Sequence, residues 1–425
     1  MMKTGIFQPL KNKSYRSLFG AQIFSDLGNW LDFVTLQVIV AYHWQLGETA
    51  IAAVIIVMAL PWVVIGPFAS VFVDRLPKKA IMTGCLITRI FFVAGLYFAP
   101  NLYVLLLFVF LKGTVAAIYD PARQSSIRMT VPEEDLAQAV TLSQLSVNTM
   151  KIAGPALGGA LIALFGVRSP FIFEAAGFFI AVLFLLGLPA LKTENLVANG
   201  TKDKKQEAGY WQELREGLRH ISSAKLLRVS IVISAIAFFI IFLYDGLFVF
   251  IAQDLGFSKG NFGILISAVG LGSVTGSLLL GKWTSWKEKP VQLMAGSSVF
   301  SGFLIISIGL GGIGIADFPN IIWIAGAFLL GSLGSGESIP YGFLLQSETP
   351  KQMMGRVSAA ATSIQTFSML VAPAAGAFIA ELIGVPAVLI GAGSATCLLG
   401  IIVLSLVAKK LSTAGAVKEA GPEAS

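Results

Sequence analysis

The chain has 425 residues, of which 56% are hydrophobic and 12% are charged, and its mean hydropathy is +0.80. A soluble domain carries about twice that share of charged residues, so the composition excludes an ordinary soluble enzyme or binding domain. The net charge of +7 follows from the placement of Lys and Arg described below, and it does not indicate a nucleic-acid partner.

Apolar segments long enough to cross a bilayer, about 20 residues each, follow one another along the whole chain. We predict an all-α polytopic membrane protein with twelve transmembrane helices. The predicted spans lie near residues 17–42, 49–72, 80–99, 102–127, 135–165, 170–191, 226–251, 261–281, 291–315, 320–346, 355–383 and 385–408.

The longest polar interruption, at residues 192–220, divides the spans six and six. This division predicts two pseudo-symmetric six-helix bundles. The expected parts are an N-terminal bundle over 1–191, a cytoplasmic central loop over 192–225, a C-terminal bundle over 226–410 and a disordered cytoplasmic tail over 411–425.

The basic residues predict the orientation of the chain. With both termini inside, 25 of the 30 Lys and Arg residues fall in cytoplasmic segments, three lie within spans, and the external loops hold only Arg168 and Lys259. Such an asymmetry is typical of cytoplasmic loops. We therefore expect a multi-pass protein of a bacterial-type inner membrane with both termini in the cytoplasm. Because the N-terminus is polar and basic, we expect no cleavable signal peptide.

The two halves repeat. The segment IAGPALGG at 152–159 has a weaker echo, LVAPAAGA, at 370–377, and a shift of 218 residues also pairs Gly166 with Gly384. Parallel six-helix repeats are one route to alternating access, although a repeat alone could be an inert duplication.

The loop between the second and third spans reads GPFASVFVDRLPKK, residues 66–79. We interpret its charges as a network at the cytoplasmic mouth, because exposed pairs are each worth only about 0–1 kcal/mol and a network is needed to bias a two-state element. A solvated turn is the plainer alternative. The residues assigned to this gate are Asp74, Arg75, Lys78, Lys79, Asp120 and Arg123.

Gly154, Pro155, Gly158 and Gly159 interrupt the fifth span. Proline cannot donate a hydrogen bond to the carbonyl four residues earlier, so a bend is expected. Gly154 and Gly158 are spaced to let a neighbouring helix approach closely, and we expect that helix to be the eighth span. The alternative is a packing seam with no role in coupling.

These two motifs and the stretch Tyr119–Val167 resemble the major facilitator superfamily. Within it, the chain is most similar to drug:proton antiporter-type exporters of the macrolide-efflux and enterobactin-exporter branch. The resemblance covers all twelve spans and implies gating by the loop at 66–79. It also implies an exporter role for the fifth-span motif and a basic residue in the fourth span, where this chain has Lys112. Ser70 and Pro77 stand where the family usually has Gly.

Charged residues also lie inside the spans. Asp32 in the first span and Lys112 in the fourth are expected at a similar depth, where a charge costs at least ~2.5–3.5 kcal/mol and therefore faces a partner or water. We predict that Asp32 carries the proton and that Lys112 modulates its proton affinity, a fixed ion pair being the alternative. Asp26 could share this role or pair with Arg89.

In the second half, Glu337 lies mid-span among small residues. It is a candidate site for a proton or a cationic substrate, or else part of a local hydrogen-bonded structure. Lys151 could face Glu337 or the substrate cavity. The other residues assigned to that cavity are Trp30, Asn29 and Tyr341. Glu174 and Glu381, near the predicted external ends, are expected to be solvated.

The two cysteines and two histidines match no metal motif, and no GxxxxGK[ST] phosphate loop is present. We therefore expect no enzyme activity, cofactor or metal site. The expected partners are a small-molecule substrate, protons and membrane lipids, and the protein is expected to be a monomer.

The sequence thus predicts a proton-coupled exporter of a lipophilic drug, macrolide-like antibiotic or siderophore, of the kind that contributes to multidrug resistance. A lipid flippase or uncoupled facilitator on the same fold is the first alternative. A membrane sensor that does not transport is the second.

Overall fold

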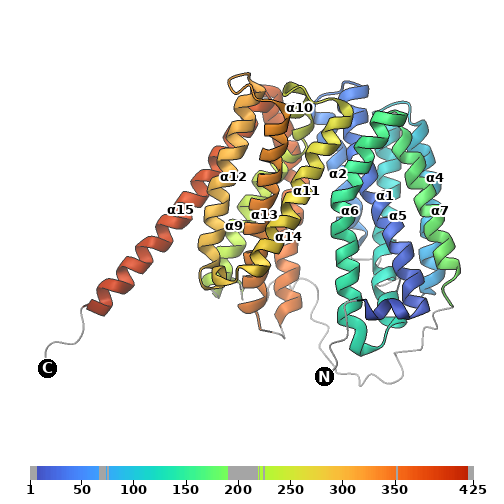
Figure 1. The fold of residues 1–425 in the computed structure, drawn as a ribbon, viewed down its shortest axis with the longest axis horizontal. Coiled ribbons are helices and arrows are strands. Elements are labelled where there is room, and N and C mark those ends of the chain that lie inside the picture. The colour runs from blue at the N-terminus through green and yellow to red at the C-terminus, as the bar shows by residue number, and fades with distance from the viewer. Residues whose placement is uncertain are drawn as a thin grey trace. The chain divides into compact units, whose positions relative to one another are not determined.

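The computed structural model describes residues 7–66, 73, 76–189, 219, 221–223, 225–350 and 353–419, and every regular element in these ranges is helical (Figure 1). Ten helices there are long and apolar enough to cross a membrane. Two more apolar helices are shorter: Glu48–Val64 and the part Ala153–Phe165 of a longer helix. Together they match the twelve predicted spans in order.

Contacts divide the chain into two compact units. The first comprises Met1–Lys205 with Phe257–Ser267, and the second comprises Gln206–Gly256 with Ala268–Ser425. The start of the eighth span thus groups with the first unit. The predicted domain limits at residues 191 and 226 fall where the chain is mostly outside the described residues, and they stay a prediction.

The first unit holds the first six spans. They are α1 (Lys13–Val38), which ends in the π-helical turn Ile39–His43, then α2 (Glu48–Val64), α4 (Lys78–Phe98), α5 (Leu102–Thr130), α6 (Leu136–Phe165) and α7 (Ser169–Leu186). The short 3-10 helices Gln8–Lys11 and Glu133–Asp135 precede α1 and α6.

The second unit holds the other six, with the start of α11 assigned to the first. They are α9 (Lys225–Asp245) with the short α10 (Phe248–Asp254), α11 (Lys259–Lys282), α12 (Pro290–Gly312), α13 (Asn320–Ser347), α14 (Met354–Ile383) and α15 (Val385–Glu419). A 3-10 turn, Ser285–Glu288, separates α11 from α12. Helix α15 runs to Glu419, and the predicted start of the tail at residue 411 stays a prediction.

Asparagine side chains define two helix starts in the first unit. Asn12 accepts hydrogen bonds from the backbone N–H groups of Ser14 (2.9 Å) and Tyr15 (3.4 Å), and its amide donates to the carbonyl of Thr130 at the end of α5 (2.7 Å). Asn101 likewise accepts from Val104 N–H at the start of α5 (3.1 Å). These caps satisfy backbone donors that a helix leaves free.

The repeat seen in the sequence has a structural counterpart within each unit. In the first, Gly158 of α6 faces the carbonyl of Leu31 on α1; in the second, Gly376 of α14 faces the carbonyl of Leu243 on α9. Gly158 and Gly376 are 218 residues apart, which is the shift that aligns the halves. The same shift relates the two glycines that end α6 and α14, Gly166 (φ 93°) and Gly384 (φ 86°), in a backbone conformation that favours glycine.

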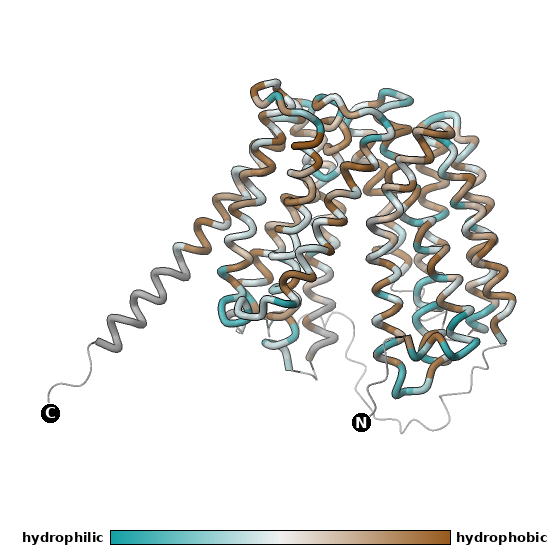
Figure 2. Tube along the Cα trace, viewed as in Figure 1, coloured by the Kyte–Doolittle hydropathy of each residue, from teal (hydrophilic) through white to brown (hydrophobic). Residues whose placement is uncertain are grey.

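Hydrophobic residues run along the helices, and hydrophilic residues concentrate at the turns between them (Figure 2). Large apolar side chains such as Phe91, Phe98, Tyr103 and Phe300 are well exposed on the helix surfaces. In water such surfaces would be costly, but lipid tails solvate them. The hydrophilic residues that lie inside the helices of the first unit are therefore the ones that need an explanation.

Candidate buried charge cluster

Seven charged side chains are buried in the described part of the first unit, and two of them, Lys78 (3% exposed) and Arg123 (6% exposed), are described further below; the other five lie mid-span. Their exposed fractions are all below one tenth: Asp26 8%, Asp32 2%, Arg89 0%, Lys112 7% and Glu174 0%. Burying one charge without a partner costs several kcal/mol, so such groups are normally paired.

Lys112 joins two carboxylates from different helices. Its ammonium group on α5 forms an ion pair with Asp32 on α1 and another with Glu174 on α7, where Nζ lies 2.6 Å from Oε1. Asp32 and Lys112, which the sequence analysis expected at a similar depth, are thus in direct contact. One lysine bound to two acids is an arrangement that protonation of either acid would change.

Glu174 corrects an expectation. The sequence analysis placed it near a solvated external end, yet it is fully buried and its second oxygen, Oε2, accepts no hydrogen bond within the described part of the chain. The physical reason is that Ser169 and Pro170 at the start of α7 are themselves buried, so this end of the helix lies inside the unit. Its signal in the sequence was an acid flanked by apolar residues in FIFEAAGFF.

Arg89 lies beside this cluster on α4. Its guanidinium group donates to Asn29 and to the hydroxyl of Ser25 (3.3 Å), and it lies over the ring of Phe178 at 4.1 Å. Asp26 is not its hydrogen-bonding partner, contrary to one alternative above. Phe178 follows Glu174 by one helical turn, and both side chains pack against Gly28 of α1. Asn29, assigned to the substrate cavity, therefore binds Arg89.

Asp26 belongs to a second, hydrogen-bonded network. Its Oδ2 accepts from the amide of Gln22 (3.0 Å) and from the hydroxyl of Ser146 on α6 (2.8 Å). Ser143 donates to Gln22 Oε1 (2.9 Å) and accepts from Arg123 of α5 (2.9 Å). The sequence analysis did not single out these polar residues. Ser143 and Ser146 are three residues apart in a span, and this spacing indicates one polar face of the helix.

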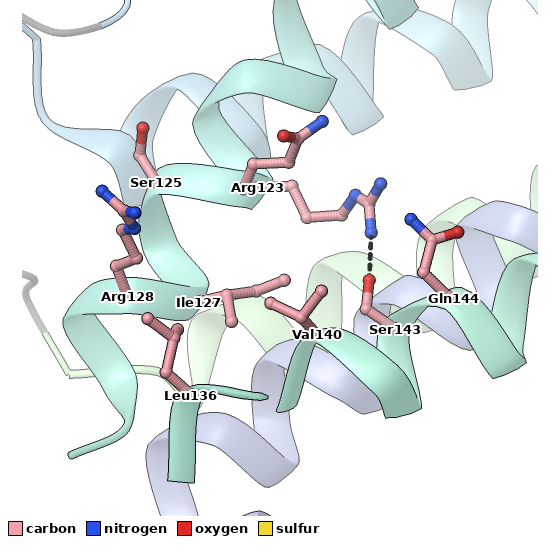
Figure 3. A pocket seen from close by; sticks show the side chains of 9 residues that line it. Arg123, Ser125, Ile127, Arg128, Leu136, Val140, Ser143 and Gln144 are labelled. Atoms are coloured by element: carbon pink, nitrogen blue, oxygen red, sulfur yellow. Dashed lines mark hydrogen bonds between the residues drawn. The ribbon is translucent and has the colours of Figure 1, made fainter. Parts of the chain in front are cut away.

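Arg123 also reaches the edge of a pocket between α5 and α6. It forms an ion pair with Asp120 at 3.2 Å. Figure 3 shows the bond between Arg123 and Ser143 at one side of the pocket, with Ile127 and Val140 in its centre and Arg128 on the other side. The pocket has a volume of about 430 Å³, and its other lining residues are Gln124, Ser125, Leu136 and Gln144.

The remaining gating residues are only partly described. Asp74 and Arg75 lie outside the described residues. Lys78 is buried and donates to the carbonyl of Val73. Lys79 donates to the carbonyls of Leu186 (3.0 Å) and Leu188 at the end of α7, so it binds a helix terminus and a favourable dipole.

The glycines of α6 face two different helices. Gly154 packs against Trp30 and Gly158 against Leu31, both on α1. The expectation that these two glycines face the eighth span is therefore wrong. Gly159 does so instead: an added Cβ would lie 2.7 Å from the carbonyl oxygen of Gly260 at the start of α11. Register decides this, since adjacent helix positions point about 100° apart. Pro155 is inside α6, as expected.

The described part of the second unit contains an isolated mid-span carboxylate. Glu337 of α13 is half-buried and accepts a hydrogen bond from Ser298 of α12 (2.7 Å), and no described Lys or Arg forms an ion pair with it. Tyr341, assigned to the cavity, packs against the hydrophobic core of this unit, and its hydroxyl accepts from Gln365 at 3.5 Å. The side chain of Lys151 lies outside the described residues.

Over the described ranges, no group of three or more His, Cys, Asp or Glu side chains is arranged to hold a metal ion. The buried acids instead pair with Lys and with hydroxyl or amide donors.

Two repeated units of membrane-spanning helices, the first of which buries ion pairs between its helices, indicate a multi-pass membrane transporter. The Major Facilitator Superfamily matches residues 18–373, and the chain belongs to this family.

The chain is similar to named relatives over most of its length. It is 27% identical to the uncharacterized MFS-type transporter YfiS of Bacillus subtilis (strain 168) over 407 residues, 94% of each chain. It is 23% identical to macrolide efflux protein A of Streptococcus pyogenes over 82% of this chain and 86% of the relative. It is also 28% identical to the enterobactin exporter EntS of Shigella flexneri over 61% of this chain and 58% of the relative.

Among solved structures, the nucleoside transporter NupG matches with a TM-score of 0.70, at 13% identity, over 93% of this chain and 98% of that one. A likeness at this identity supports the fold alone.

Proposed function

We propose that this transporter exports lipophilic or amphipathic small molecules by proton-coupled alternating access. The observation that carries the proposal is the cluster Asp32–Lys112–Glu174, in which two buried carboxylates compete for one ammonium group. An ionisable group inside a membrane span is by default a functional candidate.

The charge balance of this cluster gives a mechanism. With all groups ionised, the two carboxylates are balanced by Lys112 and the neighbouring Arg89, whose charge lies within electrostatic range of both acids. A proton on either carboxyl group leaves one excess positive charge, which favours a conformation that exposes the cluster to water. Because the two acids share one cation, the proton belongs to the pair rather than to either residue.

The names of two relatives support the class of cargo. Macrolide efflux protein A and the enterobactin exporter EntS are both named as exporters of small molecules. Their low identity to this chain leaves the cargo itself to experiment, so a macrolide and a siderophore are the first compounds to test. The proposal includes an inner-membrane location, cytoplasmic termini, a monomeric state and a gate formed by the loop at 66–79.

The test uses inside-out vesicles with an acidic lumen and a pH-sensitive probe. Adding a macrolide, a siderophore or a lipophilic cation should dissipate the pH gradient in the wild type. It should not do so in Asp32→Asn or Glu174→Gln. Glu381→Gln, which changes an exposed carboxylate, is the matched control and should behave as the wild type. Transport that leaves the gradient untouched would instead support the facilitator or flippase alternative.

Glu337 supports a second role within the same function. A half-buried carboxylate that accepts a hydrogen bond from Ser298 and has no ion-pair partner among the described residues suits the positive centre of a cationic substrate. Glu337→Gln should then reduce transport of lipophilic cations while leaving transport of neutral compounds intact. Equal loss for both kinds of compound would place Glu337 in proton coupling instead.

A further inference from the structure

We infer that the pocket between α5 and α6 is the aqueous route by which water reaches Asp26, and that Gln22 closes it. The inference rests on the proposed function, because such a route matters only if Asp26 exchanges a proton. It assigns this pocket to proton traffic, and no substrate needs to pass through it.

The first observation is that the pocket ends at the network of Asp26. Ser143 lines the pocket and is bonded to Gln22 twice: its hydroxyl donates to Oε1 and its carbonyl oxygen accepts from Nε2, each at 2.9 Å. The same Nε2 donates to Asp26 at 3.0 Å. One amide side chain therefore separates the pocket from the carboxylate.

The second observation is that Gln22 can act as a closure but not as a proton carrier. Its side chain is 1% exposed, and its amide N–H donates to two acceptors at once. Neutral amides do not relay protons as hydroxyl groups and water do. Rotation of the Gln22 side chain away from Asp26 would expose the carboxylate to water that enters through the pocket. When Gln22 rotates back, the carboxylate would again be separated from that water.

The groups around Asp26 suit such a route. From α5, Arg123, Asp120 and the phenol of Tyr119 lie within electrostatic range, and from α6 the hydroxyl of Ser146 donates to it. The Tyr119 hydroxyl is buried and has no hydrogen-bond partner among the described residues. Buried polar groups of this kind normally bind ordered water.

The pocket itself is polar at its edge and apolar in its centre. Arg123 and Ser143 lie at one side of the pocket, and Ile127 and Val140 lie in its middle (Figure 3). Ser143 is the lining residue that is bonded to Gln22. A bulky side chain at Val140, which is 46% exposed, should therefore obstruct the route without touching Asp26 or Gln22.

The test measures how fast a small, charged methanethiosulfonate reagent modifies Asp26→Cys in the full-length protein in which Cys85 and Cys397 are replaced by serine. Val140→Trp should slow the modification about tenfold, because it obstructs the pocket. Gln22→Ala, which removes the hydrogen-bonded side chain between the pocket and position 26, should speed the modification about tenfold. Leu145→Trp, an equally bulky change at an exposed residue of α6 outside the pocket lining, should leave the rate unchanged.

If Asp26→Cys does not fold, Ser146→Cys reports the same site, because this hydroxyl touches Asp26 from α6. An unchanged rate in Val140→Trp, or no modification in Gln22→Ala, would overturn the inference. The labelling needs neither substrate nor proton gradient. A chain with the labelling pattern above that fails the vesicle assay would therefore refute the proposed function and leave the water route standing.

Discussion

Lys112 is the residue on which the buried cluster depends. It is the only described residue in ion-pair contact with either Asp32 or Glu174, and removing it would leave two carboxylates in a low dielectric. Losing one partner of a buried pair usually costs about 3–5 kcal/mol. By contrast, Asp32→Asn or Glu174→Gln removes one negative charge, and Lys112 keeps the other carboxylate as its partner.

Lys112→Met should therefore lower the thermal unfolding temperature of the purified protein more than Glu174→Gln does. Circular dichroism in detergent measures both. Lys282→Met, at an exposed lysine in the last turn of α11, is the control and should have little effect. If Lys112→Met unfolds at the wild-type temperature, the cluster is not an ion-paired one.

At the scale of the elements, α4 and α7 fasten each other at both ends. Lys79, in the first turn of α4, donates to carbonyls at the end of α7, and Arg168, just before α7, donates to the carbonyls of Tyr97 (2.9 Å) and Ala99 (3.0 Å) at the end of α4. A cation at a helix C-terminus is typically worth about 0.3–1 kcal/mol. We expect Lys79→Ala and Arg168→Ala each to lower the unfolding temperature, and the double variant to lower it by the sum. Lys287→Ala, at an exposed residue, serves as control. Equal unfolding temperatures of the wild type, the two single variants and the double variant would show that these contacts do not stabilise the packing of α4 on α7.

The repeated glycine contacts give a graded prediction. An added Cβ at Gly376 would overlap the carbonyl of Leu243, whereas at Gly158 it would lie 3.3 Å from the carbonyl oxygen of Leu31. Gly376→Ala should thus cost about 1–3 kcal/mol and Gly158→Ala clearly less. Gly296→Ala, where an added Cβ meets nothing within 4 Å, should stabilise α12 slightly. Unfolding temperatures in the reverse order would show that α9 and α14 do not pack as described.

The sequence predicted the spans and the repeat because lipid imposes helix length and hydropathy on every segment. It also predicted the pairing of Asp32 with Lys112, since two opposite charges in apolar spans have few alternatives. It did not predict Glu174, whose depth depends on how the start of α7 is buried. Nor did it assign Gly154 and Gly158 to α1, since that choice depends on helix rotation, which a small-residue motif does not encode.

At the scale of the whole molecule, the charge asymmetry predicts a topology. In intact cells, an impermeant thiol reagent should label Ser258→Cys, in the exposed turn before α11, and should not label Ser285→Cys, in the exposed turn before α12. Both variants should react once the membrane is permeabilised. Labelling of Ser285→Cys alone would show that the orientation is inverted.

Infrared difference spectroscopy of the purified protein during a pH titration tests directly whether the cluster Asp32–Lys112–Glu174 exchanges a proton. Raising the pH should remove the band of a protonated buried carboxyl group in the wild type. Because the acids around Lys112 share the proton, this signal should be altered in both Asp32→Asn and Glu174→Gln, and it should be unchanged in Glu381→Gln. A band that is the same in the wild type and in both cluster variants would contradict proton exchange at Asp32–Lys112–Glu174.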